Sequence, residues 1–248
     1  MHRFFSPQSD LTARQVSILD PSEIHHMRDA LRLKVGDPVS LFDGSGKEAV
    51  GTIARSEKNE ILVSIHSVRD SKPSRNIRLT LACAIPKKTK FEFIIEKCTE
   101  LGVDEIIPMH TKRTEFRFEE EKIRKKSERY KTVAINAGKQ SKRSTIPTIH
   151  AVTKFTDVLS NLSPDTIAFI PCLIPNTKNL QHAFKIPANT KNILFLIGPE
   201  GDFTADEVDA AIKTGCIPVS LGPTVLKVDT AAICVIALAN LFLSKEQS

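Results

Sequence analysis

The sequence predicts an α/β protein of two domains, a small β-rich domain at residues 1–70 and a larger domain with a parallel sheet at residues 77–248. Two observations predict the larger domain: its strand candidates are apolar throughout, and they alternate with helices, as is typical of a buried parallel sheet. The smaller domain is predicted by several short strand candidates around one helix. Residues 71–76 are polar, contain a proline and lack periodicity, so they are expected to form a linker.

The N-terminal domain is expected to be a small β-barrel. Residues 20–23 (Asp-Pro-Ser-Glu) predict a helix start, because Asp can cap, Pro suits the first turn and Glu can close a capping box. Strand candidates at 38–42 and 49–53 flank residues 43–46 (Asp-Gly-Ser-Gly), which indicate a hairpin turn, and a third strand is expected at 61–65. Several short strands in one compact unit favour a barrel.

The larger domain begins with a strand, a helix and a second strand, followed by a long charged helix. The elements expected before residue 190 are a strand at 77–85, a helix at 87–101 closed by Gly102, a strand at 103–109, a helix at about 119–140, a short helix at 155–162 and a strand at 167–170.

The C-terminal end repeats one plan, in which an apolar strand breaks at Gly-Pro and a helix follows. The first strand, 193–197, breaks at residues 198–201 (Gly-Pro-Glu-Gly), and the next helix has a capping-box start at Thr204 and Glu207 and ends at Gly215. The second strand, 217–221, breaks at Gly222-Pro223. A last helix, apolar on nearly every face, is then expected at about 230–243.

Both Gly-Pro breaks fall at the carboxyl end of a predicted parallel strand, which is where open α/β sheets bind ligands. Glycine lets bare backbone approach a ligand, and proline fixes φ and removes a donor. With residues 171–173 as a third wall, the breaks predict a pocket built mainly from main chain and suited to a nucleoside-like ligand. The loops alone favour the alternative, a pair of tight turns without a ligand, because Gly and Pro mark most turns.

The composition agrees with an RNA partner without requiring one. The chain has 248 residues, 41% of them hydrophobic, and carries 35 Lys and Arg against 29 Asp and Glu, for a net charge of +6. This basic balance favours a polyanion, although solubility explains so modest an excess nearly as well. The five cysteines lack C-x-x-C spacing, so they are expected to be reduced core thiols in a cytoplasmic protein without a metal site.

Several motifs are absent from the sequence. It has no apolar run of about 18 residues that could span a membrane and no apolar h-region of a signal peptide. It also lacks the G-x-G-x-x-G and G-x-x-x-x-G-K-[ST] fingerprints, so Rossmann and P-loop nucleotide sites are not expected.

Several segments of the sequence resemble a known family. Residues 196–203 (LIGPEGDF), 219–223 (VSLGP) and 226–232 (LKVDTAA) are similar to the C-terminal signature of the RsmE family, the 16S ribosomal RNA uracil-N3 methyltransferases of the SPOUT superfamily. The N-terminal residues 1–5 (MHRFF), residues 26–32 (HMRDALR) and residues 96–103 (EKCTELGV) resemble the same family. The resemblance therefore spans nearly the whole chain, in the expected order.

The resemblance implies a PUA-like RNA-binding domain, a C-terminal trefoil knot, a homodimer and action on the 30S subunit. It also implies that S-adenosylmethionine (SAM) binds in the knot loops. In this sequence those loops would be the two Gly-Pro breaks. The candidate cofactor-binding residues are Leu196, Ile197, Gly198, Pro199, Glu200, Gly201, Ser220, Leu221, Gly222, Pro223, Leu226, Thr230 and Ala231.

The implied chemistry requires the uracil N3 to lose its proton and attack a methyl sulfonium in line. The protein must stabilise the imidate charge or accept the proton, and the base must be unpaired or flipped out. Arg143 and Lys227 are the candidate catalytic cations, with Arg113 a further one; the candidate acceptors are Glu96, Glu100 and Glu200, the last of which could instead cap the next helix. Because Arg143 lies in a loop after a charged helix, contact with phosphate is its more expected role.

The first predicted helix carries a cationic stripe, because His25, Arg28 and Arg32 share helical spacing. Such a stripe suits phosphates, although a solvated helix face is the commoner explanation. The candidate RNA contacts are Arg3, His25, Arg28, Arg32, Arg113 and Arg143.

Some residues depart from the family pattern, namely Asp202, Thr224, Lys227, Asp229, Asn136, Lys139 and Lys142. Lys227 keeps the charge of the family's arginine but loses its bidentate fork. Two alternatives therefore stand beside the uracil-N3 methyltransferase: a SPOUT-like RNA-binding protein without methyl transfer, and a SPOUT methyltransferase acting on another RNA.

Overall fold

The computed structural model describes residues 1–7, 9–71, 75–87, 90–114, 120–175 and 177–245. The expected linker residues 72–74 and the expected helix positions 88–89 and 119 lie outside this described part.

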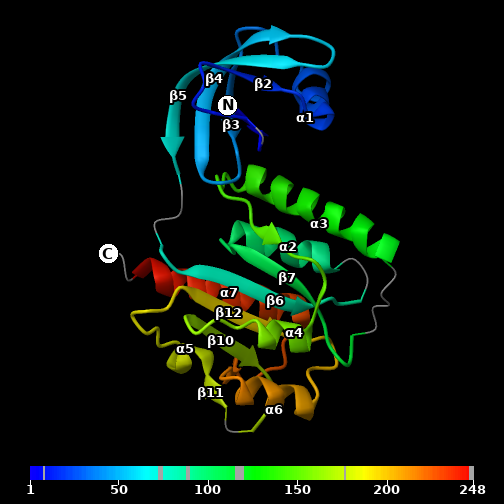
Figure 1. Cartoon of the computed structure of the whole chain (residues 1–248), viewed down its shortest axis with the longest axis vertical. Coiled ribbons are helices and arrows are strands. Elements are labelled where there is room, and N and C mark those ends of the chain that lie inside the picture. Colours follow the sequence, from blue (N-terminus) through cyan, green and yellow to red (C-terminus); the bar gives the residue numbers. More distant parts are fainter. Residues whose placement is uncertain (8, 72–74, 88–89, 115–119, 176, 246–248) are drawn as a thin grey trace. The chain divides into compact units, whose positions relative to one another are not determined.

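The contacts of the described residues group them into two compact units (Figure 1). Unit 1 consists of Met1–Ser74 and Gly138–Ile146, and unit 2 of Arg75–Ala137 and Pro147–Ser248. The sequence analysis assigned residues 138–146 to the larger domain, whereas the contacts group them with unit 1. The boundaries at 70 and 77 stay a prediction.

Unit 1 is built on a five-stranded sheet with the order β1-β3-β4-β5-β2. Its strands are β1 (His2–Phe5), β2 (Gln15–Ile18), β3 (Pro38–Phe42), β4 (Lys47–Ser56) and β5 (Ile61–Asp70). The predicted hairpin joins β3 to β4 in antiparallel register, and its turn is closed by the Asp43 carboxylate, which accepts from the backbone N–H groups of Ser45 and Lys47. Alternating side chains of these strands form the core, including Phe4, Leu41 and Val63.

The predicted helix of unit 1 is shorter than expected and changes its winding. Asp20 caps α1 (Pro21–His25) as predicted, by accepting from Ser22 and Glu23 N–H groups. The Glu23 side chain does not close a capping box; its carboxylate is paired with Lys139 in the same unit. From His26 to Ala30 the helix continues as one π turn. The chain leaves this turn before Arg32, which has a positive φ of 54°.

Unit 2 contains eight parallel strands in its described residues, seven of them in the order β11-β13-β10-β12-β6-β7-β8, with β9 also on β7. These strands are β6 (Arg78–Ala84), β7 (Glu105–His110), β8 (Thr148–Ile149), β9 (Thr153–Lys154), β10 (Thr166–Pro171), β11 (Lys178–Asn179), β12 (Asn192–Ile197) and β13 (Ile217–Ser220). The central strands are buried on both faces, which confirms the inference from their unbroken apolar sequences.

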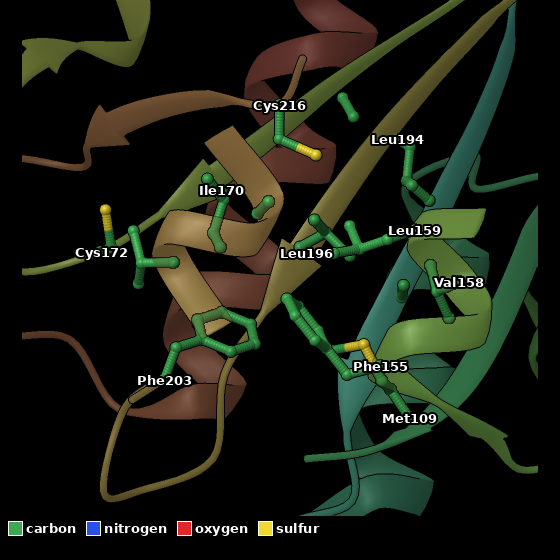
Figure 2. Close-up of a cluster of buried hydrophobic side chains, with 14 residues drawn as sticks. Met109, Phe155, Val158, Leu159, Ile170, Cys172, Leu194, Leu196, Phe203 and Cys216 are labelled. Carbon is green, nitrogen blue, oxygen red and sulfur yellow. The ribbon is translucent and has the colours of Figure 1, made fainter. Parts of the chain in front are cut away.

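Helices cover both faces of this sheet. The helices of unit 2 are α2 (Lys90–Glu100), α3 (Glu120–Gln140, continuing into unit 1), α4 (Phe155–Ser160), α5 (Leu180–Ala183), α6 (Ala205–Lys213) and α7 (Val228–Lys245). Side chains of α4 and α6 pack on Leu194 and Leu196 of β12, as Figure 2 shows. α7 passes on the other face, behind the strands in Figure 1, and packs on α2.

The α/β class with an N-terminal β domain is therefore confirmed. The threading of a knot stays a prediction from the family resemblance.

Candidate functional site

A cavity of about 380 Å³ lies in unit 2 at the carboxyl ends of β10, β12 and β13. These three strands are neighbours and run parallel, so the loops that follow them meet at one edge of the sheet. The residues that line the cavity come from those loops and from the first turns of α2 and α7. They are Lys90, Pro171, Cys172, Leu173, Ile197, Gly198, Pro199, Glu200, Asp202, Ser220, Leu221, Gly222, Thr224, Val225, Leu226, Lys227, Val228 and Ala231.

Most of the residues predicted for the cofactor line this cavity, as does Lys227. Leu196, Gly201, Pro223 and Thr230 do not. Leu196 is fully buried on the opposite side of β12, in the cluster of Figure 2. The expected third wall, 171–173, lies where the sequence analysis placed it. Binding of a cofactor by these residues stays a prediction.

The loop from Gly198 to Phe203 is held by side chains and backbone of other segments. Phe203 packs into the core with its ring centroid 5.3 Å from that of Phe155. The Arg113 guanidinium donates to the carbonyl oxygens of Gly201, at 2.6 Å, and Phe203, at 3.4 Å. Arg113, predicted as an RNA contact, therefore anchors a cavity loop in this structure.

The two carboxylates of this loop have backbone partners. Glu200 accepts a hydrogen bond from the Lys87 N–H at 3.1 Å, which ties the loop to the segment after β6. Asp202 accepts from the N–H of Phe203 at 2.8 Å and from that of Leu173 at 3.3 Å. Glu200 therefore does not cap the following helix, the alternative role that the sequence left open. Thr204 is the cap of that helix.

The predicted capping box of α6 is present. Thr204 and Glu207 exchange side-chain to backbone hydrogen bonds, and the buried Glu207 carboxylate also accepts from the Lys112 N–H at 2.8 Å. The Lys112 ammonium pairs with Asp206 at 2.8 Å, and this hydrogen bond raises the pKa of Lys112 and lowers that of Asp206. Lys112 thus supports the first turn of α6, which follows the loop that Arg113 holds.

The loop after β13 is held mainly by its own turn. The Ser220 hydroxyl donates to the Gly222 carbonyl oxygen at 3.1 Å and accepts from the Gly222 N–H at 3.2 Å. Gly222 has a φ of +129°, and a Cβ added there would meet no atom within 4 Å. The tip is open to solvent, since Val225 is 75% exposed. Lys227 follows on the cavity wall, also exposed.

The third wall follows β10. The Cys172 N–H donates to the carbonyl oxygen of Val219, which fastens this wall to β13. Burial raises the pKa of the Cys172 thiol, so the group stays protonated and unreactive at neutral pH. Leu173 is 65% exposed at the rim.

Charged side chains of both signs line the cavity, with Lys90 and Lys227 opposite in charge to Glu200 and Asp202. Five lining residues were not assigned to the site from the sequence: Lys90, Asp202, Thr224, Val225 and Val228. Lys90 could have been found, because it begins a helix after β6, and the helices after parallel strands begin at the same edge of the sheet. The other proposed proton acceptors, Glu96 and Glu100, pair with Lys97 on α2 and do not line the cavity.

The predicted cationic stripe of unit 1 is partly neutralised. Arg28 and His25 both hydrogen-bond the Asp29 carboxylate, and these bonds lower the pKa of Asp29 to about 2. Arg32 lies beyond the helix, so it does not continue the stripe.

The other arginines predicted for RNA in unit 1 have protein partners. Arg3 pairs with the buried Glu48 and lies 4.2 Å from the Phe42 ring centroid, a position that favours a structural role. Desolvation lowers the pKa of Arg3. Arg143, which lies in the 138–146 segment, donates to the Thr145 hydroxyl at 3.0 Å.

Neither a metal nor a membrane site is indicated by the described residues. They contain no group of three His, Cys, Asp or Glu side chains placed to bind an ion. None of their helices combines the length and the apolar character needed to cross a bilayer.

Two family models match the chain. An RNA methyltransferase domain matches residues 73–240, and an RNA methyltransferase PUA domain matches residues 19–65. The ribosomal RNA small subunit methyltransferase E of Rickettsia conorii is 31% identical over 230 residues, which cover 92% of this chain and 90% of the relative. The protein of the same name from Synechocystis is 30% identical, with 91% of this chain and 73% of the relative covered.

Solved structures agree with these matches over the whole chain. The ribosomal RNA small subunit methyltransferase E of Neisseria gonorrhoeae, bound to S-adenosyl methionine, superposes with a TM-score of 0.87 at 26% identity and 98% coverage of both chains. A methyltransferase of Legionella pneumophila in complex with SAM gives 0.86 at 28% identity, with 97% of both chains covered. Since the methyltransferase model spans well over half of the chain and relatives at 30% identity cover nearly all of it, the protein belongs to the RNA methyltransferase family that includes ribosomal RNA small subunit methyltransferase E.

Proposed function

We propose that this protein transfers the methyl group of SAM to N3 of a uridine in small-subunit (16S) ribosomal RNA, acting on the 30S subunit. The observation that carries the proposal is the cavity at the ends of β10, β12 and β13 in a chain of the RNA methyltransferase family. Its volume of about 380 Å³ is within the range of small-molecule sites. The open space beside Gly222 leaves backbone accessible to a nucleoside, as the cofactor requires.

The residues of this chain have two tasks in the reaction. When bound, SAM supplies an electrophilic methyl group on a sulfonium. The main chain of loops 198–203 and 220–227 would hold the donor, and positioning of this kind contributes several kcal/mol to a bimolecular transfer. Lys227 lines the cavity and would stabilise the negative charge that develops on the deprotonated uracil. Arg143 is proposed to act on the RNA, at a phosphate or at the reacting base.

The RNA would be held by unit 1, which contains the matched PUA domain. Arg28 and His25 are exposed or half-buried, and their shared partner Asp29 is itself exposed, so phosphate can compete for them. Charge reversal by Arg28→Glu with Arg32→Glu is expected to weaken RNA affinity and flatten its salt dependence while leaving SAM affinity unchanged.

We further propose a homodimer that works in the cytoplasm, where its ribosomal substrate is assembled. The support for a dimer is α7, whose side chains are apolar on nearly every face while Leu241 remains 66% exposed. Sedimentation equilibrium of the wild-type protein tests this, and a monomer at micromolar concentration would refute it.

The methylation assay uses undermethylated 30S subunits, labelled SAM and mass spectrometry of the nucleosides. The proposal expects 3-methyluridine at one position, reduced at least tenfold in Lys227→Ala and largely retained in Lys227→Arg. Binding of SAM without methyl transfer to any RNA would instead support the non-catalytic alternative. Methylation of another RNA would overturn the assignment to 16S ribosomal RNA, and methylation of another atom would overturn the assignment to uracil N3.

A further inference from the structure

Asp202 has an unusual backbone conformation for a residue in a cavity wall. Its φ is +60°, in the left-handed region that L-residues other than glycine rarely adopt. Asp tolerates this region better than most residues because its short side chain can hydrogen-bond nearby backbone. Such a conformation persists only where the surrounding structure holds it, so the contacts of the Asp202 side chain are the relevant observation.

The carboxylate bridges two loops of the cavity. Oδ1 accepts from the N–H of Phe203 at 2.8 Å, which is the local bond that the left-handed conformation permits. Oδ2 accepts from the N–H of Leu173 at 3.3 Å. Leu173 follows β10 and Asp202 follows β12, so one side chain joins the walls that rise from two adjacent strands.

Few other contacts restrain the wall at Leu173. Leu173 is 65% exposed, so packing restrains its side chain weakly. On its other side the wall is fastened to β13 through Cys172 and Val219. The bond from Asp202 joins this wall to the Gly198–Phe203 loop, and both segments line the cavity.

We infer that Asp202 is a positioning residue that joins the wall after β10 to the loop after β12 and so sets the width of the cavity for the cofactor. The inference rests on the proposed function, because it takes SAM as the occupant. A carboxylate is needed because it offers two acceptor oxygens to two N–H donors. An amide offers one acceptor and places an NH₂ group against the other donor.

A different role for the same carboxylate can be separated by experiment. If Asp202 acted mainly through its negative charge on the cationic methyl donor, its loss would weaken SAM binding more than binding of the neutral-sulfur product S-adenosylhomocysteine. A positioning residue shapes the cavity for both molecules. It is therefore expected to change both affinities by the same factor.

The experiment compares the wild-type chain with Asp202→Gly, Asp202→Asn and the control Lys142→Gly. Lys142 has the same φ of +60° but belongs to unit 1 and does not line the cavity, so its replacement by glycine relieves the same backbone strain without touching a cavity wall. Calorimetry should show affinity for SAM and S-adenosylhomocysteine reduced about tenfold in Asp202→Gly, the factor expected for one lost hydrogen bond to a charged group. Asp202→Asn should weaken both ligands, and Lys142→Gly neither.

A second measurement does not depend on the ligand. Amide hydrogen exchange of the peptide that contains Leu173 should be faster in Asp202→Gly than in wild type and unchanged in Lys142→Gly. Unchanged exchange and unchanged affinities in Asp202→Gly, or a loss confined to SAM, would overturn the positioning role. If wild type binds no SAM, the proposed function fails, while faster exchange in Asp202→Gly would still support the bridge between the walls.

Discussion

The two Gly-Pro loops of the cavity have similar sequences and different supports. The first, from Gly198 to Phe203, is held by Arg113, by the Lys87 backbone and by a phenylalanine in the core. The second, after β13, is closed by hydrogen bonds between Ser220 and Gly222 and has an exposed tip. The comparison indicates that one wall of the site is built by tertiary contacts and the other by local turn chemistry.

The glycines of the two loops are consequently required for different reasons. A Cβ at Gly198 would lie 3.1 Å from the Phe203 ring, closer than ordinary contacts allow. A Cβ at Gly222 would meet no atom, but its φ of +129° is strained for any L side chain. Gly198 therefore serves packing, whereas Gly222 serves conformation and leaves space for a ligand.

The largest effect is expected for Gly198→Val. The branched side chain must displace Phe203 from the core and with it the loop that Arg113 holds, so we expect a loss of about 1–3 kcal/mol in the free energy of unfolding. SAM binding should be abolished. Urea denaturation and calorimetry measure the two effects. A stable variant with wild-type affinity for SAM would show that close packing of Gly198 against Phe203 does not support the first loop.

A smaller loss of stability is expected for Gly222→Ala, with a strong effect on the ligand. The strained φ should destabilise the protein by about 1–2 kcal/mol, and the methyl group should reduce SAM affinity because it occupies the open space. Gly215→Ala is the matched control, since Gly215 also has a positive φ, of 91°, with nothing near its Cβ, and it does not line the cavity. Equal SAM affinity in the two variants would argue against a ligand at Gly222.

Arg113→Ala tests the support of the first loop alone. Removal of two hydrogen bonds from an exposed guanidinium to carbonyl oxygens should reduce stability by about 1 kcal/mol. We expect weaker SAM binding, with RNA affinity nearly unchanged. Arg129→Ala, which removes another exposed arginine of this unit, is the control. A loss of RNA affinity without a loss of SAM affinity would restore the RNA-contact role that the sequence suggested for Arg113.

The smallest effect concerns the pH dependence of the first turn of α6, which follows the same loop. Lys112 lowers the pKa of Asp206, so the pair stabilises the folded state above the ordinary Asp pKa of about 3.9, and this contribution is lost as the pH falls and Asp206 is protonated. Asp206→Asn should lower the Tm slightly at pH 6 and not at pH 3. Asp209→Asn, exposed on the same helix, should not show this difference. An identical Tm deficit at both pH values would contradict the role of the pair.

Local signals predicted well the edge of unit 2 at which the cavity lies. Apolar strands, the Gly-Pro breaks and the Thr204–Glu207 capping box each depend on residues close in sequence, and the structure contains all three. The roles of the charged residues were predicted less well. Glu48, the partner of Arg3, is 45 residues away, and the carbonyl acceptors of Arg113 are 88 and 90 residues away. The partner of Arg28, Asp29, is its neighbour in the sequence, so this pair was a local signal.

Periodicity and turn chemistry were enough to predict the two-part organisation, the parallel sheet and the edge at which the cavity lies, because both act over a few residues. Three contacts became visible only in the folded chain: Asp202 joins two walls of the cavity, Lys139 pairs with Glu23, and Arg113 supports the first cavity loop. Those roles depend on which donor and acceptor meet after distant strands pair, and a carboxylate or guanidinium can take any of several partners until the fold brings one within hydrogen-bonding distance.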